Sequence, residues 1–79
     1  LMKINPIGSN QTELIFDDGA KVLFSYETPV AAYVPERGYI KTSYKWSQTT
    51  SRHINRWCPE SVFSVPQQEI SALVEGVKR

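Results

Sequence analysis

The sequence predicts an α+β domain: an antiparallel β-meander of four to five strands, followed by two C-terminal α-helices packed on one face. Short segments rich in β-branched and aromatic residues fill the first half, and the turn residues between them indicate strands. In the second half, apolar residues recur at the three- and four-residue spacing of amphipathic helices. Because 79 residues suffice for one small core, residues 1–79 are expected to form a single domain.

The opening segments predict an edge strand and a hairpin. Residues 2–7 have the pattern of a short strand, and Pro6 suits an edge because proline has no N–H to donate to a neighbour. Residues 12–16 and 21–26 flank Asp17-Asp18-Gly19, a strong hairpin signal since glycine tolerates the positive φ of tight turns. Neither arm alternates cleanly between apolar and polar residues, so we expect both faces of this hairpin to contact apolar groups.

Two further segments complete the meander. Residues 30–34 form a short apolar run that is typical of a strand. Pro35-Glu36-Arg37-Gly38 then places proline and glycine at the positions that a turn favours. Residues 39–43 are expected to return as the last strand of the sheet.

The first helix is predicted to begin after Ser47, whose hydroxyl suits an N-cap. It is expected to end near Trp57, because Pro59 disfavours helical geometry at the residue before it. At 100° per residue, Thr50, Ile54 and Trp57 fall on one side of this helix. That side is therefore expected to face the sheet.

A connector over residues 60–64 is predicted to lead to the second helix. Pro66 is a favoured first helical residue, and the carboxylate of Glu69 suits the positive end of the helix dipole. Lys78 and Arg79 complement the dipole at the other end. The apolar stripe of this helix comprises Ile70, Leu73, Val74 and Val77. The expected core of the whole domain comprises Leu14, Phe16, Val22, Phe24, Val30, Ile54, Trp57, Ile70, Leu73 and Val74.

Composition and motifs limit the classes of function. Cys58 is the only cysteine, which excludes an internal disulfide and favours a cytoplasmic location. No apolar run approaches the roughly 20 residues that cross a bilayer, so no membrane partner is expected. His53 lies between two arginines and is expected to face solvent, with no predictable nucleophile or carboxylate beside it. We therefore expect no enzymatic activity, no catalytic residue, no metal and no cofactor.

The stretch from Tyr39 to Cys58 has no acidic residue and carries the clearest functional signal. It contains four Lys/Arg, the only His and both Trp, whereas residues 1–38 have three Lys/Arg against five Asp/Glu. Clustered cationic side chains neutralise phosphates, and aromatic side chains stack on unpaired bases. The candidate nucleic-acid-binding residues, which apart from Trp46 are predicted to share one face, are Lys41, Lys45, Trp46, Thr49, Arg52, His53 and Arg56.

Other interpretations of this stretch stay open. The basic residues could simply solvate a helix face while Trp46 and Trp57 anchor the core. A helix N-terminus rich in Ser and Thr could instead lock the helix to the sheet through hydroxyl hydrogen bonds. The alternative function is a homo-oligomeric assembly or protein-docking module without nucleic-acid affinity, because an edge strand and exposed aromatics favour association with a second copy or a larger protein.

Three segments carry a resemblance to a known family: SYETPVAAY, GYIKTSYKWSQTTSRHINRW and VPQQEISALV. Together, over most of residues 10–75, they resemble a family of small uncharacterised proteins of tailed bacteriophages. The resemblance implies a viral or prophage origin, and hence the host cytoplasm and phage or host proteins as candidate partners. It implies no assigned activity and no catalytic residues. The matching positions are Tyr39, Lys41, Thr42, Trp46, Ser47, residues 49–55 and Trp57.

These observations combine into one functional hypothesis. The sequence predicts a small phage-type protein of unknown function that acts as a non-enzymatic binding module. Its basic helix face is expected to contact nucleic acid or another polyanion.

Overall fold

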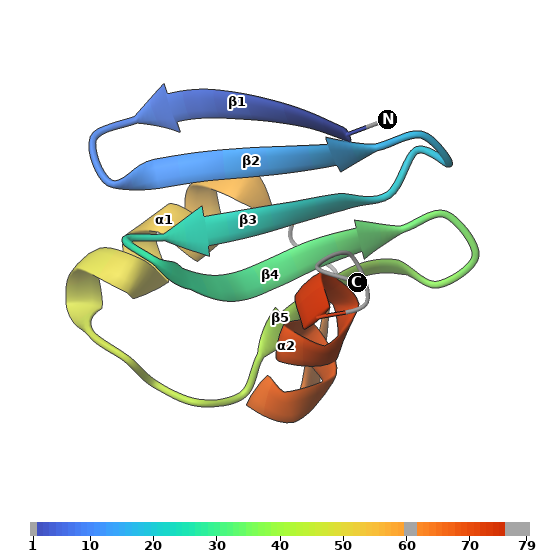
Figure 1. The fold of residues 1–79 in the computed structure, drawn as a ribbon. Helices are drawn as coiled ribbons and strands as arrows, with labels where there is room; N and C mark the ends of the chain where they lie inside the picture. Colours follow the sequence, from blue (N-terminus) through green and yellow to red (C-terminus); the bar gives the residue numbers. More distant parts are fainter. Residues whose placement is uncertain (1, 60–61, 76–79) are drawn as a thin grey trace.

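The computed structural model describes residues 2–59 and 62–75, which form a mixed sheet and two helices (Figure 1). The strands lie in the sheet in the order in which they occur in the sequence, and neighbouring strands are antiparallel except for the last pair, which is parallel. The elements are β1 (Met2–Gly8), β2 (Gln11–Phe16), β3 (Lys21–Ser25), β4 (Thr28–Val34), β5 (Gly38–Thr42), α1 (Gln48–Trp57), β6 (Phe63–Val65) and α2 (Gln67–Glu75).

The two predicted turns are confirmed. Between β2 and β3, the Asp18 carboxylate accepts a hydrogen bond from the Ala20 N–H at 3.0 Å, and Gly19 has a φ of 93°. Between β4 and β5, Gly38 has a φ of 84°, in the left-handed region that glycine adopts without steric cost. Both hairpins therefore form where the sequence places its turn residues.

The predicted strand count of four to five is wrong, because the described part of the chain has six strands. The missed strand, β6, overlaps the connector expected over residues 60–64, of which residues 60 and 61 fall outside the described residues. It pairs in parallel with β5, with Ile40 opposite Phe63 and Thr42 opposite Val65. The helix α1 supplies the crossover that a parallel pair requires. A three-residue strand is too short to show a period of two in the sequence.

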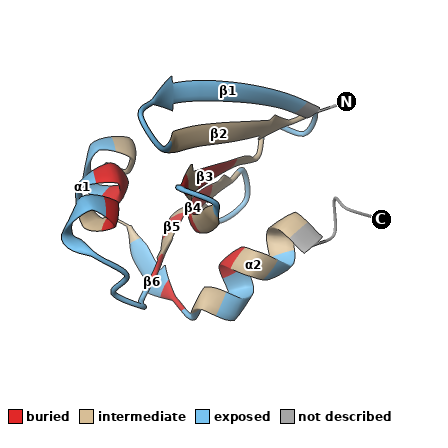
Figure 2. Ribbon diagram, turned by 60° about the vertical axis from the view of Figure 1, so that its left-hand side comes forward, coloured by how far each residue is buried: buried red, intermediate tan, exposed pale blue. Residues whose placement is uncertain are grey.

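The prediction that both helices pack on one face is also wrong. Val22 and Leu23 are adjacent in β3, so their side chains point to opposite faces of the sheet. Val22 belongs to a core cluster with Ile70 of α2, whereas Leu23 belongs to a second cluster with Ile54 of α1. Figure 2 accordingly shows α1 and α2 on opposite sides of the sheet, with β6 leading from one side to the other. This arrangement confirms that both faces of β3 contact apolar groups.

A β-bulge in β4 enlarges the cluster on the α1 face. Leu23 pairs with Ala31 and Phe24 pairs with Pro29, which leaves Val30 as an extra residue in β4. Such a bulge interrupts the strict alternation of side chains. As a result, both Val30 and Ala31 are buried in the cluster beneath α1.

The expected core is confirmed in part. Val22, Val30, Ile54 and Ile70 are buried, and the other six expected residues pack around them while partly exposed. Val77, Lys78 and Arg79 lie outside the described residues. Neither described helix is long and apolar enough to cross a membrane. The buried apolar residues that the sequence pattern did not indicate are Leu23, Ala31, Ala32, Ile40 and Val65.

Candidate functional site

The acid-free stretch spans β5, the loop of residues 43–47, and α1. Alternation along β5 places Ile40 in the cluster under α2, so Lys41 faces the α1 side of the sheet. Tyr39, two residues before Lys41, confirms this orientation because its ring contacts that of Trp57 in α1, with centroids 5.5 Å apart. The sheet therefore presents Lys41 toward the flank of α1.

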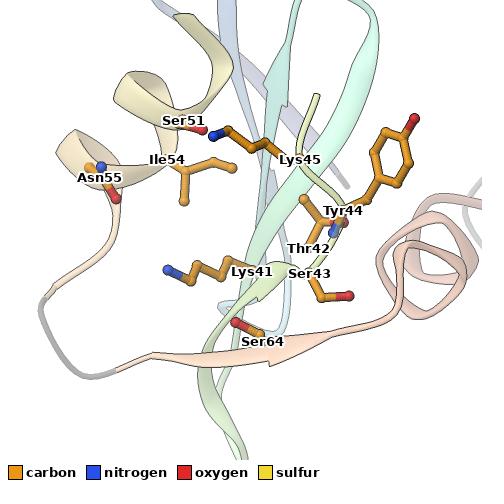
Figure 3. Close-up of a pocket in the computed structure, with 9 residues that line it drawn as sticks. All are labelled: Lys41, Thr42, Ser43, Tyr44, Lys45, Ser51, Ile54, Asn55 and Ser64. Carbon is orange, nitrogen blue, oxygen red and sulfur yellow. The ribbon is translucent and has the colours of Figure 1, made fainter. Parts of the chain in front are cut away.

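Lys41 and Lys45 line a hollow of about 240 Å³ between β5 and one flank of α1. Figure 3 shows both lysine side chains extending toward α1, where Ser51, Ile54 and Asn55 also line the hollow. A neighbouring hollow of about 230 Å³ shares Lys41, Ile54 and Asn55 and continues toward Cys58. We call these two adjoining hollows together the lysine groove.

The polar lining of the lysine groove suits an anion. Besides the two ammonium groups, the lining includes the Asn55 side chain and several hydroxyl groups, and none of the described residues that line it is acidic. Lys, Ser, Thr and Asn side chains are common donors to phosphate oxygens. The hydroxyl-bearing residues of the groove are Thr42, Ser43, Tyr44, Ser51 and Ser64.

Two exposed aromatic residues border the groove. Tyr44 and Trp46 form an edge-to-face pair with ring centroids 4.5 Å apart. The indole N–H of Trp46 donates to the side-chain oxygen of Gln67 at 3.1 Å, and the amide N–H of Gln67 donates to the Pro29 carbonyl at 2.7 Å. These bonds join the loop of residues 43–47 to α2 and β4. The interpretation that Trp46 anchors the core is thus wrong, because 45% of its surface is exposed.

Trp57 differs from Trp46, because it does contribute to the core. It is half-buried against the cluster under α1, and its indole N–H donates to a carboxylate oxygen of Glu13 at 2.7 Å. The anchor interpretation therefore holds for one of the two tryptophans. Trp57 also joins α1 to β2, which contributes no residue to the lysine groove.

Thr49, Arg52 and Arg56 are exposed on α1, but none of them lines the lysine groove. At 100° per residue, Arg56 lies about 140° around the helix from Ser51, which does line it. The sequence-predicted basic face is therefore divided. Lys41 and Lys45 converge on one hollow, and the two arginines lie farther around α1.

The expectation that His53 faces solvent is wrong, because only 7% of its surface is exposed. Its Nδ1 lies 2.8 Å from the Ser25 hydroxyl oxygen, which in turn lies 2.9 Å from the hydroxyl oxygen of Thr50. Ser47 caps α1 by accepting from the Thr50 N–H at 3.1 Å and donates to the Thr50 hydroxyl at 3.2 Å. We call Ser25, Ser47, Thr50 and His53 the hydroxyl lock. It confirms the interpretation that hydroxyl hydrogen bonds join this helix to the sheet.

Replacing Thr50 by valine is expected to destabilise the protein by about 1–3 kcal/mol, because it removes the buried Thr50 hydroxyl and with it two hydrogen bonds of the lock, one with Ser25 and one from Ser47. The neighbouring Thr49→Val is a matched control, since Thr49 is exposed on the same helix. It should change the free energy of unfolding by less than about 0.5 kcal/mol. Urea unfolding monitored by circular dichroism measures the free energy of unfolding of both variants. Equal losses would show that the hydroxyl lock does not stabilise the protein.

Cys58, at the end of the groove, is expected to be a poor nucleophile. Burial raises the pKa of its thiol from 9.0 to about 11, and the positive charge of Lys41 opposes this shift. Since only the thiolate reacts, we expect iodoacetamide at about pH 8 to alkylate the folded protein at least tenfold more slowly than the urea-unfolded chain. Equal rates would contradict the raised pKa.

The raised pKa of Cys58 also makes stability depend on pH. The thiol loses its proton at a lower pH in the unfolded chain than in the folded protein, so the free energy of unfolding should fall as the pH rises from 9.0 to about 11.

The described residues contain no group of three or more His, Cys, Asp or Glu that could hold a metal ion. The fold and the site thus define a small α+β protein with a helix on each face of an open sheet and a lysine-lined groove beside one helix. The chain belongs to the family of unknown function DUF8033, whose family pattern matches residues 2–72. Neither a curated protein nor a solved structure matches it.

Proposed function

We propose that this protein binds single-stranded nucleic acid, with phosphates in the lysine groove and unpaired bases on the exposed aromatic pair. The observation that carries this proposal is the convergence of Lys41 and Lys45 on a hydroxyl-lined hollow directly beside Tyr44 and Trp46. Each lysine neutralises one phosphate, and the hydroxyl groups donate further hydrogen bonds to the backbone. An unpaired strand fits this site better than a duplex, because its bases are free to stack on aromatic rings.

The two arginines have a secondary role in this proposal. Arg52 and Arg56 are exposed on α1 outside the groove, so they raise the local positive potential without contacting the phosphates that the lysines hold. His53 is assigned to the hydroxyl lock and makes no contact with nucleic acid. A phage origin, with the host cytoplasm as the place of action, stays a prediction.

Fluorescence anisotropy tests the proposal with labelled DNA of about 15 nucleotides, single-stranded and duplex, at about 50 and 200 mM salt. We expect the single strand to bind more tightly than the duplex, and the affinity to fall as the salt concentration rises. A titration with single-stranded RNA of the same length shows whether the 2′-hydroxyl group changes the affinity. Absence of binding to both single strands at the lower salt concentration would refute the proposed function.

A second candidate function, self-assembly, is favoured by the exposed edge of the sheet. Residues 3–8 of β1 are all exposed, and Ile4 is exposed over 63% of its surface. Such an edge is a template for pairing with another chain, although Pro6 removes one of its N–H donors. Light scattering over a range of protein concentrations separates the two functions. A monomer at every concentration excludes self-assembly and leaves nucleic-acid binding untouched.

A further inference from the structure

A further hollow, distinct from the two that form the lysine groove, is also lined by residues of the loop 43–47. It measures about 200 Å³, and two aromatic residues line it, Tyr26 from the turn after β3 and Trp46 from the loop. Val30 provides an apolar surface, and Thr28 and Ser47 bring hydroxyl groups. Ser25 and Thr50 of the hydroxyl lock complete the lining. We call this hollow the aromatic pocket.

The aromatic pocket differs from the lysine groove in its charge. None of the described residues that line the pocket is charged, whereas two lysines line the groove. Apolar and aromatic surface with a few hydroxyl groups suits a flat, uncharged ring that has polar edges. A nucleobase has both properties, since its faces stack on aromatic rings and its edge forms hydrogen bonds.

Tyrosine is an unusual residue at position 26, in the two-residue turn that joins β3 to β4. Tyr26 has a φ of 59°, in the left-handed region, where a bulky side chain is strained and glycine or asparagine is favoured. The core does not require the ring there, because 53% of Tyr26 is exposed. Its ring centroid lies 6.1 Å from that of His53. A strained, exposed aromatic residue at the edge of a hollow is the kind of outlier that marks a binding site.

The loop of residues 43–47 connects the two sites. Tyr44 and Lys45 line the lysine groove, and the next two residues, Trp46 and Ser47, line the aromatic pocket. Consecutive residues of this loop therefore line both hollows. A strand that contacts this loop therefore lies near both the cationic groups of the groove and the uncharged aromatic pocket.

We propose that the aromatic pocket binds one unpaired nucleobase of the strand whose phosphates lie in the lysine groove. This inference rests on the proposed function and extends it, because it assigns a base-binding site to Tyr26 and Trp46. The protein should therefore distinguish a strand with bases from a bare sugar–phosphate backbone of the same length and charge.

The test compares two oligonucleotides of about 15 positions, oligothymidine and an abasic strand of the same length, in anisotropy titrations. Wild-type protein should bind oligothymidine more tightly than the abasic strand. Tyr26→Gly should weaken oligothymidine binding about tenfold and leave abasic binding unchanged, since one base stack is lost and the phosphate contacts remain. Glycine suits the φ of this position, so the variant should keep the fold, which circular dichroism verifies.

Asn10→Gly is the matched control. Asn10 has a φ of 61°, and its backbone carbonyl accepts from the Tyr26 N–H at 2.7 Å, a bond that glycine preserves. This variant should bind both strands as the wild type does. Tyr26→Asn provides a second route if the glycine variant fails to fold, because asparagine also tolerates this φ.

The outcomes separate this inference from the proposed function. If the wild type binds neither strand at low salt, the proposed function itself fails. If wild-type binding is salt-dependent but Tyr26→Gly weakens it equally for both strands, or for neither, the base pocket is refuted while the lysine groove stands. Weaker binding of oligothymidine alone supports the pocket.

Discussion

Replacing Lys41 and Lys45 together by glutamine is expected to weaken binding of single-stranded DNA by at least about 100-fold at low salt. Each lysine is proposed to make a charge-assisted hydrogen bond to a phosphate, and such bonds contribute roughly 1.5–3 kcal/mol each. Glutamine retains much of the side-chain length and removes the charge. Because Lys41 faces the α1 side of β5 and Lys45 lies in the loop, neither substitution removes a residue of the buried core.

The matched control for this variant is Arg52→Gln with Arg56→Gln, which changes the net charge of the protein by the same amount. If the groove holds two phosphates, the lysine variant should reduce the slope of log affinity against log salt by about 1.4, or about 0.7 per phosphate on a single strand. The arginine variant should change the slope by less than half as much. A larger effect of the arginines would place the binding surface on the outer side of α1 instead.

Replacing Ile70 by alanine should have the largest effect on stability, a loss of about 2–5 kcal/mol. Ile70 has no exposed surface and is the residue through which α2 enters the cluster of Val22, Ala32, Ile40 and Val65. A protein of this length has a total stability of roughly 4–12 kcal/mol, so this loss is a large fraction of it. Chemical unfolding measured by tryptophan fluorescence gives the value.

Two further substitutions show whether packing on both faces of the sheet contributes to the stability of the protein. Ile54→Ala removes the contact of α1 with the other cluster and should also destabilise by about 2–5 kcal/mol. Ile4→Ala is the control, because Ile4 is exposed on β1 and should change stability by less than about 0.5 kcal/mol. If Ile70→Ala were as mild as Ile4→Ala, the packing of α2 against the sheet would be wrong.

The local features of this fold could be predicted from the sequence. The turn at Asp17-Asp18-Gly19, the N-cap at Ser47 and the end of α1 before Pro59 all depend on residues close in the chain, and the structure confirms them. The sequence also indicated that β3 is apolar on both faces. Local sequence patterns were therefore sufficient to predict features that depend on the backbone conformation of a few neighbouring residues.

The non-local features could not be predicted in the same way. Pairing of β6 with β5 depends on a crossover through α1, and three residues carry no periodic signal of their own. The apolar stripe of α2 shows that the helix packs on the sheet but does not show on which face. Either face was possible, because β3 has apolar residues on both. His53 is buried because Ser25, which lies 28 residues earlier, supplies a partner for its ring nitrogen.

The same distinction between local and non-local features applies to the candidate site. The acid-free stretch contains Lys41 and Lys45, which line one hollow, and their role in binding stays a prediction. It did not indicate that Ser51 and Asn55 complete this hollow or that the arginines lie outside it. Tyr26 gave no signal at all, because its left-handed backbone becomes visible only in the folded chain.

An NMR titration of ¹⁵N-labelled protein with single-stranded DNA at low salt shows whether the lysine groove binds single-stranded nucleic acid. Amide shifts are expected to change most in residues 41–47 and in Ser51 and Asn55, which line or border the groove. A second, smaller set of changes is expected around Tyr26. Absence of shift changes, or changes confined to β1, would contradict the claim.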